Sequence, residues 1–66
     1  MAKYVVFVNE FNQNADESIT FEMTFDSLKD VTKYVSHFSC NKYCSGHVDK
    51  LTLVDGEWFS DTIMHF

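Results

Sequence analysis

Two segments near the N-terminus have the alternating apolar pattern of β-strands. Residues 3–9 are apolar at nearly every position, so the first strand should have an apolar side chain on each of its faces. Residues 18–25 alternate regularly, which predicts a second strand with one buried and one wet face. Between them, residues 11–17 are polar and predict a connecting loop.

A helix is predicted after the second strand. The segment Ser27-Leu28-Lys29-Asp30 has the form of a capping box, in which the Ser27 hydroxyl accepts a hydrogen bond from a free backbone N–H. Apolar residues then recur at helical spacing and form one stripe. These residues are Leu28, Val31, Val35 and Phe38. We expect the helix to end between residues 39 and 43, with Gly46 as the last stop signal.

The C-terminal segment predicts a second hairpin. Residues 51–54 and 57–60 flank Asp55-Gly56, a pair that tolerates the positive φ angles of a type I′ turn. This turn pairs Leu53 with Trp58 and Leu51 with Ser60 on one face, and Thr52 with Phe59 and Val54 with Glu57 on the other. The tail through Ile63, Met64 and Phe66 could extend the last strand.

The order of these elements predicts an α+β fold of the form ββαββ. A right-handed crossover through the helix lays the third strand beside the first, which gives a four-stranded antiparallel sheet of order 2-1-3-4. One helix covers only one face of such a sheet. The other face should then hold a surplus of apolar side chains. If the register differs by one residue, the intervening residues of each strand lie on that face instead. The expected set is Val5, Phe7, Thr52, Val54, Phe59 and Ile63.

That surplus face has two interpretations. It is either a surface for a partner or a second copy of the chain, or it is covered by the long loop and the C-terminal tail. Trp58 shares its face with Leu51 and Leu53, and we expect it in the core rather than at an interface.

The chain is short and rich in aromatic residues. Its 66 residues leave room for a single domain over residues 1–66, and 45% hydrophobic residues suffice for a core. The N-terminus has no basic region followed by a long apolar stretch, which predicts neither a secretory signal nor a membrane span. We therefore expect a cytoplasmic protein whose two cysteines remain thiols.

Charge narrows the choice of partners. Ten acidic residues and five lysines give a net charge of −5, and arginine is absent. Direct binding of nucleic acid is disfavoured, because phosphate contacts depend on clustered basic residues. A protein partner with a basic surface is favoured, although the same charge also keeps a small domain soluble.

One cluster has the residue types of a zinc site. It is His37, Cys40, Cys44 and His47. The spacing differs from that of zinc fingers, and on a continuous helix His37 and His47 would be about 15 Å apart. A zinc-stabilised module is therefore an alternative that requires the chain to fold back near Asn41. Otherwise the cysteines pack near the helix end and no cofactor is needed.

The same residues are a poor basis for catalysis. A Cys/His nucleophile needs a lowered thiol pKa, an orienting group and an enclosed pocket, and one helix on four strands leaves little volume for a pocket. No phosphate loop, nucleophile elbow or dinucleotide motif occurs. We expect a protein that is not an enzyme.

The layout resembles that of small early proteins of T4-type and T7-type bacteriophages. The resemblance rests on a short acidic chain, an N-terminal hairpin ending at residues 25–28, one helix over residues 27–38 and a closing hairpin around residues 54–58. It implies a host-takeover protein, an inhibitor or antitoxin that occupies the working surface of a host nucleic-acid-handling enzyme, nuclease toxin or defence factor. The His37–His47 cluster is a departure from that layout.

These observations favour a binding protein that blocks a host protein in the cytosol of the host cell. A homodimer with a structural or regulatory role is a further alternative. The candidate partner-binding residues lie on the predicted open face and at loop and turn positions. They are Phe59, Val54, Phe7, Glu10, Asp16, Glu17, Asp55 and Glu57.

Overall fold

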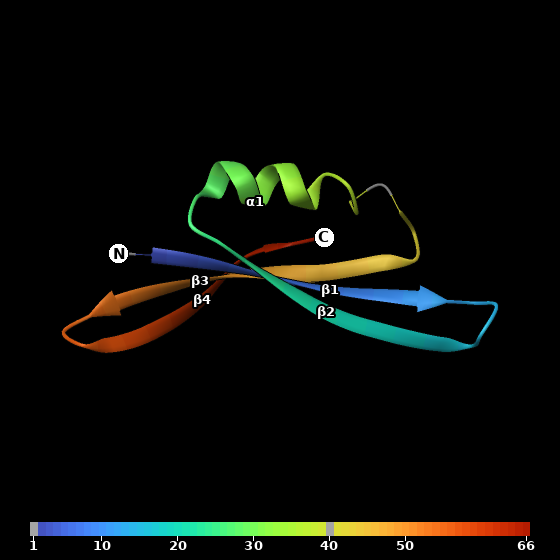
Figure 1. Ribbon diagram of the computed structural model, residues 1–66, viewed down its shortest axis with the longest axis horizontal. Helices are drawn as coiled ribbons and strands as arrows, with labels where there is room; N and C mark the ends of the chain where they lie inside the picture. The colour runs from blue at the N-terminus through green and yellow to red at the C-terminus, as the bar shows by residue number, and fades with distance from the viewer. Residues whose placement is uncertain (1, 40) are drawn as a thin grey trace.

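The computed structural model describes residues 2–39 and 41–66. In chain order it contains β1 (Ala2–Asn12), β2 (Glu17–Phe25), α1 (Leu28–Val35), β3 (Cys44–Val54) and β4 (Glu57–His65). The four strands form one antiparallel sheet of order β2-β1-β3-β4, and the helix packs against β1 and β2 on one face (Figure 1). The predicted α+β class, strand order and single-sided helix are confirmed.

The core lies between the helix and the middle of the sheet. Val6 and Val8 of β1, Val31 of α1 and Val48 of β3 are fully buried. Val35 belongs to the same buried cluster, and seven partly buried side chains pack against it. They are Tyr4, Phe21, Phe25, Tyr34, Phe38, Met64 and Phe66. Aromatic side chains thus close a core whose centre consists of small β-branched residues.

The helix is shorter than predicted. The Ser27 hydroxyl accepts a hydrogen bond from the Asp30 backbone N–H at 3.3 Å, as the capping pattern indicates. At the other end, His37 and Phe38 donate to carbonyls three residues back, and the Ser36 hydroxyl donates to the Lys33 carbonyl. These bonds tighten the chain into a turn, so that α1 ends at Val35 rather than beyond residue 39.

The third strand is longer than predicted and begins at Cys44 instead of Leu51. Its first half pairs with β1, from Cys44 opposite Glu10 to Lys50 opposite Tyr4. Gly46 permits this pairing, since a Cβ there would collide with the carbonyl oxygen of Phe7 and lie 2.8 Å from Cζ of Phe66. The Phe66 and Gly46 backbones exchange two hydrogen bonds and so extend the pairing beyond β4.

The last hairpin has the predicted register. Leu53 pairs with Trp58 and Thr52 with Phe59, and the turn residues Asp55 and Gly56 have φ angles of 51° and 81°. A register shift between Val48 and Asp49 leaves Ile63 as an extra residue in β4, a β-bulge.

The antiparallel pairing of β1 and β3 places the turns of the two hairpins at opposite ends of the sheet. The molecule measures 47 × 21 × 14 Å, and the β1–β2 and β3–β4 hairpins extend in opposite directions from beneath the helix (Figure 1). The helix therefore covers the middle of the sheet and leaves both hairpin ends exposed to solvent.

Candidate protein-binding surface

The β3–β4 hairpin end exposes apolar side chains on both of its faces. Side chains alternate along a strand, so paired residues share a face. Val54 and Phe59 lie on the helix side of the sheet, whereas Leu53 and Trp58 lie on the opposite side. Their exposed fractions are 47% for Val54, 52% for Phe59, 36% for Leu53 and 49% for Trp58. We refer to these four residues as the hairpin cluster.

The position of Trp58 corrects a sequence-based expectation. The pairing of Lys3 with Leu51 places Leu51, Leu53 and Trp58 on the face opposite the helix, so Trp58 is not in the core. Conversely, Thr52, Val54 and Phe59 are on the helix side, but the helix does not reach them. The open-face set expected from the sequence therefore contains residues from both faces.

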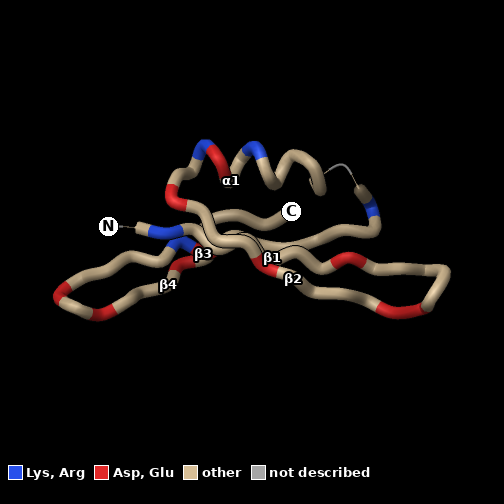
Figure 2. The backbone as a smooth tube through the Cα atoms, in the orientation of Figure 1, with Lys and Arg blue, Asp and Glu red and all other residues tan. Residues whose placement is uncertain are grey.

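Acidic side chains surround the hairpin cluster. Asp55 lies in the turn, Glu57 follows it, and Asp61 of β4 is the register partner of Lys50, the single lysine of the β3–β4 hairpin. Two of the five lysines are on the helix instead, and Figure 2 shows acidic positions near both hairpin ends and the helical lysines above the sheet. The hairpin thus combines apolar contact area with negative charge.

The other predicted acidic residues lie at the opposite end of the molecule. Glu10, Asp16 and Glu17 belong to the β1–β2 hairpin or its turn, and Asp16 has a positive φ of 53°. Two exposed apolar side chains, Phe11 and Ile19, accompany them. The structure therefore places seven of the eight predicted partner-binding residues at two opposite hairpin ends, four at one and three at the other, and does not bring all eight together.

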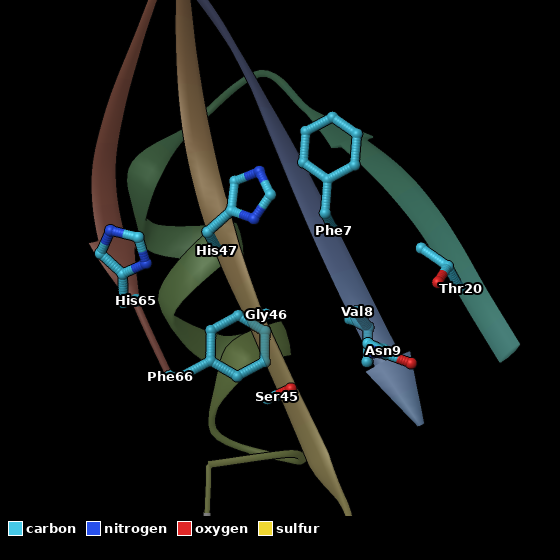
Figure 3. Close-up of a pocket in the computed structure, with 9 residues that line it drawn as sticks. All are labelled: Phe7, Val8, Asn9, Thr20, Ser45, Gly46, His47, His65 and Phe66. Carbon is cyan, nitrogen blue, oxygen red and sulfur yellow. The ribbon is translucent and has the colours of Figure 1, made fainter. Parts of the chain in front are cut away.

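Phe7 lies apart from both hairpin ends, in the middle of the face opposite the helix. Its ring stacks on the His47 imidazole with a centroid separation of 4.7 Å and an interplanar angle of 20°. These rings line a shallow groove of about 510 Å³ (Figure 3). The groove is lined by Phe7, Val8, Asn9, Thr20, Ser45, Gly46, His47, His65 and Phe66.

This middle part of the open face is mixed rather than apolar. The neighbours of Val5 and Phe7 across the strands are Thr24 and Glu22 on β2, and Asp49 and His47 on β3. The tail does not cover this face, because it continues the sheet beside Gly46. The expected loop over residues 11–17 is a short turn between β1, which ends at Asn12, and β2, which begins at Glu17. The apolar surplus predicted for the open face lies instead at the β3–β4 hairpin.

No family model, curated protein or solved structure matches this chain.

The metal-ligand set suggested by the sequence does not converge. Cys44 pairs with Glu10 on the helix side of β3, whereas His47 lies on the opposite side. Cys40 lies outside the described residues. Within residues 2–39 and 41–66 there is no group of three or more His, Cys, Asp or Glu side chains that could hold a metal ion. The chain folds back after the helix as required, but the sheet separates two of the proposed ligands.

Cys44 has the environment of a packing residue. Burial raises the pKa of its thiol above the ordinary value, and the negative charge of Glu10 acts in the same direction. The thiol therefore stays protonated at neutral pH, which makes it a poor nucleophile.

Sequence reasoning missed the proximity of His47 and His65, which are register partners on β3 and β4. The length of the last strand was the available signal, since extending it through the tail brings His65 toward the start of β3. The bulge at Ile63 fixes which residue lies opposite His47, and no local pattern predicts that bulge. Across the two described segments, no helix has the length and apolar character needed to cross a membrane.

Proposed function

We propose that this protein binds another protein through its β3–β4 hairpin and blocks the surface that it covers. The observation that carries the proposal is the hairpin cluster, in which Val54 and Phe59 on one face and Leu53 and Trp58 on the other are all exposed. A projecting hairpin that is apolar on both sides gains free energy when a cleft encloses it. Aromatic residues such as Trp58 and Phe59 dominate the energetics of many interfaces.

The charge pattern favours a basic partner. Asp55 and Glu57 lie at the tip of the hairpin, whereas its single lysine, Lys50, lies farther back opposite Asp61. The whole chain has a net charge of −5. A cleft with an apolar floor and a basic rim complements this hairpin, and the opposite charges increase the rate of association. The clefts of proteins that handle nucleic acids have such rims, because they bind phosphates.

The proposal includes the biological setting implied by the layout resemblance. A small acidic protein of a bacteriophage would act in the host cytosol as an inhibitor or antitoxin. Its target would be a host nucleic-acid-handling enzyme, a nuclease toxin or a defence factor. The hairpin then acts by occupying the target's working cleft, which requires no chemistry from the inhibitor.

The test is affinity capture from a bacterial lysate with three forms of the protein. Wild type should retain a stoichiometric protein with a positively charged surface, and added salt should weaken the complex. Phe59→Asp should lose it, because a charge replaces an apolar anchor, with affinity falling by about 30-fold or more. Ile19→Asp is the matched control, since Ile19 is 57% exposed on the same side of the sheet at the other hairpin.

Three results would contradict the proposal. Wild type could retain no stoichiometric protein, the retained protein could be acidic, or Phe59→Asp and Ile19→Asp could reduce capture equally. Circular dichroism of both variants establishes that a loss of binding is not a loss of folding.

A homodimer is the second candidate, because β2 is an edge strand with exposed apolar side chains. Ile19 and Met23 are 57% and 46% exposed on this edge, and edge strands can pair with a second copy of the chain. Sedimentation velocity at micromolar concentration separates the two candidates. A monomer at all concentrations excludes the dimer, whereas a dimer that Ile19→Asp dissociates supports it.

A further inference from the structure

We propose that His47 and His65 form a chelating site for a divalent transition-metal ion on the sheet face opposite the helix. This inference is independent of the proposed protein partner. It differs from the metal set suggested by the sequence, because it uses His47 without Cys44 or His37. The ligand class is imidazole nitrogen, which suits Zn²⁺, Cu²⁺ and Ni²⁺.

The backbone pairing brings these two side chains together. Gly46 and Phe66 exchange both of their backbone hydrogen bonds, so the adjacent pair His47 and His65 is the non-hydrogen-bonded kind. In such pairs the Cα atoms are about 4.5 Å apart and the side chains lie closest. Figure 3 shows the two imidazoles as neighbours on β3 and β4.

The separation of the rings is compatible with one shared ion. A metal ion lies about 2.0–2.1 Å from a coordinating nitrogen, and hence about 3.2 Å from the centre of that imidazole. Two rings on one ion therefore have centroids at most about 6.4 Å apart. The observed centroid separation is 6.2 Å. At a tetrahedral angle the two centroids would be about 5.2 Å apart, and at a right angle about 4.5 Å. Binding therefore requires the rings to approach by about 1.0–1.7 Å, a rotamer adjustment open to exposed His65 and to the 40% exposed His47 side chain.

Neighbouring side chains hold His47 in place. Phe7 stacks on one face of its ring, and Asp49 Oδ2 lies 3.8 Å from its Nε2, within ion-pair range but too far for a hydrogen bond. The other Asp49 oxygen accepts a 2.7 Å hydrogen bond from the Thr62 hydroxyl. Asp49 thus lies where the carboxylate that orients a metal-binding histidine usually lies, and an approach of about 1 Å would let it accept a hydrogen bond from Nε2. Nδ1 of His47 is then the nitrogen left for the ion.

The remaining coordination positions face solvent. The described residues place no third His, Cys, Asp or Glu around a common point with these two. Water would therefore complete the coordination shell, and the ion would be accessible from the groove that His47 and His65 line. A site with two protein ligands and open positions can also accept a ligand from another molecule.

The chain offers a matched control, because it has only three histidines and the third is His37. His37 is exposed in the turn that follows the helix. The experiment titrates NiCl₂ into the protein by isothermal titration calorimetry, with ZnCl₂ as a second probe. A Cys40→Ser background removes one competing thiol, and buried Cys44 is retained.

The expected result is a one-to-one complex that depends on both strand histidines. His47→Ala and His65→Ala should each lower nickel affinity by about tenfold or more, since loss of an outer partner alone costs 10–100-fold. The variant with both substitutions should bind nickel about as tightly as the single variant of lower affinity, because each single change already destroys the chelate. His37→Ala should bind like the parent, and Asp49→Asn should lose about tenfold as a positioning residue.

Nuclear magnetic resonance gives a readout without substitution. Nickel should shift or broaden the ring signals of His47 and His65 and leave those of His37 unchanged. The proposal is overturned if His47→Ala or His65→Ala retains full affinity, if His37→Ala loses as much as they do, or if all three ring signals respond alike. Absence of nickel and zinc binding at millimolar metal also overturns it.

Discussion

The helix-covered middle of the sheet and the end of the β3–β4 hairpin use the same kinds of residue in opposite environments. Val6 is fully buried beneath the helix, whereas Val54 is 47% exposed on the same side of the sheet. The difference comes from the length of the helix, because α1 has eight residues and covers only the middle of a sheet built from two long hairpins. Apolar character in this chain therefore stabilises the fold in the middle and remains available for binding at the end.

The sharpest test of this contrast places the same charge in both regions. Val6→Asp buries an unpaired carboxylate and should destabilise the fold by about 4 kcal/mol or more. A domain of this size has a free energy of unfolding of about 3–10 kcal/mol, so Val6→Asp should remove a large part of it. Val54→Asp should cost at most about 1 kcal/mol. Urea unfolding followed by circular dichroism measures both, and equal losses would contradict the contrast.

The second test uses the two glycines. Gly46→Ala should destabilise the protein by about 2–3 kcal/mol, because the new Cβ meets the Phe7 carbonyl oxygen in the centre of the sheet. A Cβ at Gly56 would meet no other atom, but the φ of 81° at this position disfavours any residue with a Cβ. Gly56→Ala should cost about 1 kcal/mol. Thermal unfolding of both variants checks the order, and a larger loss at Gly56 would place the tighter constraint at the turn.

Neighbouring residues encode some elements of this fold, whereas pairing between distant segments determines others. The Ser27 cap and the Asp55-Gly56 turn depend on a few neighbouring residues, and both were predicted. The residues from Cys44 to Lys50 contain histidine, serine and glycine and lack a regular apolar alternation. They become a strand because β1 and β4 pair with them on either side, which no local pattern encodes.

The sequence does not determine which side chains of the last hairpin face the helix. A shift of one residue in a strand register exchanges the two faces. β1 and β3 are far apart in the sequence, with β2 and the helix between them, so no local pattern fixes their register. In the structure Lys3 pairs with Leu51. This pairing moves Trp58 away from the helix and Phe59 toward it. As a result, the predicted anchors Phe59 and Val54 lie together at the hairpin end, but Phe7 does not join them.

A smaller effect is expected at the helix cap. Ser27→Ala removes the side-chain acceptor for the Asp30 N–H and should cost about 1 kcal/mol. Ser60→Ala, on the exposed β3–β4 hairpin, should change stability by about 0.5 kcal/mol or less. Chemical denaturation of the two variants sharpens the comparison, because a cost at Ser60 equal to that at Ser27 would mean that the hairpin contributes as much to folding as the helix.

The smallest expected effect is the contribution of Cys44 to the pH dependence of stability. Burial, aided by Glu10, raises the thiol pKa in the folded protein above the ordinary value of 9.0. The folded state then keeps a proton that the unfolded chain releases, so the free energy of unfolding falls as pH rises through 9. In a Cys40→Ser background, this fall should be steeper with Cys44 than with Cys44→Ala.

A cysteine at the exposed hairpin end provides the comparison for that measurement. Val54→Cys in a Cys40→Ser/Cys44→Ala background places a thiol where water reaches it in both the folded and unfolded states. Its titration should leave the slope of stability against pH unchanged, because folding does not alter its solvation. The same slope of unfolding free energy against pH for the thiols at positions 44 and 54 would mean that water reaches both equally. That result would contradict the burial of Cys44 at the start of β3.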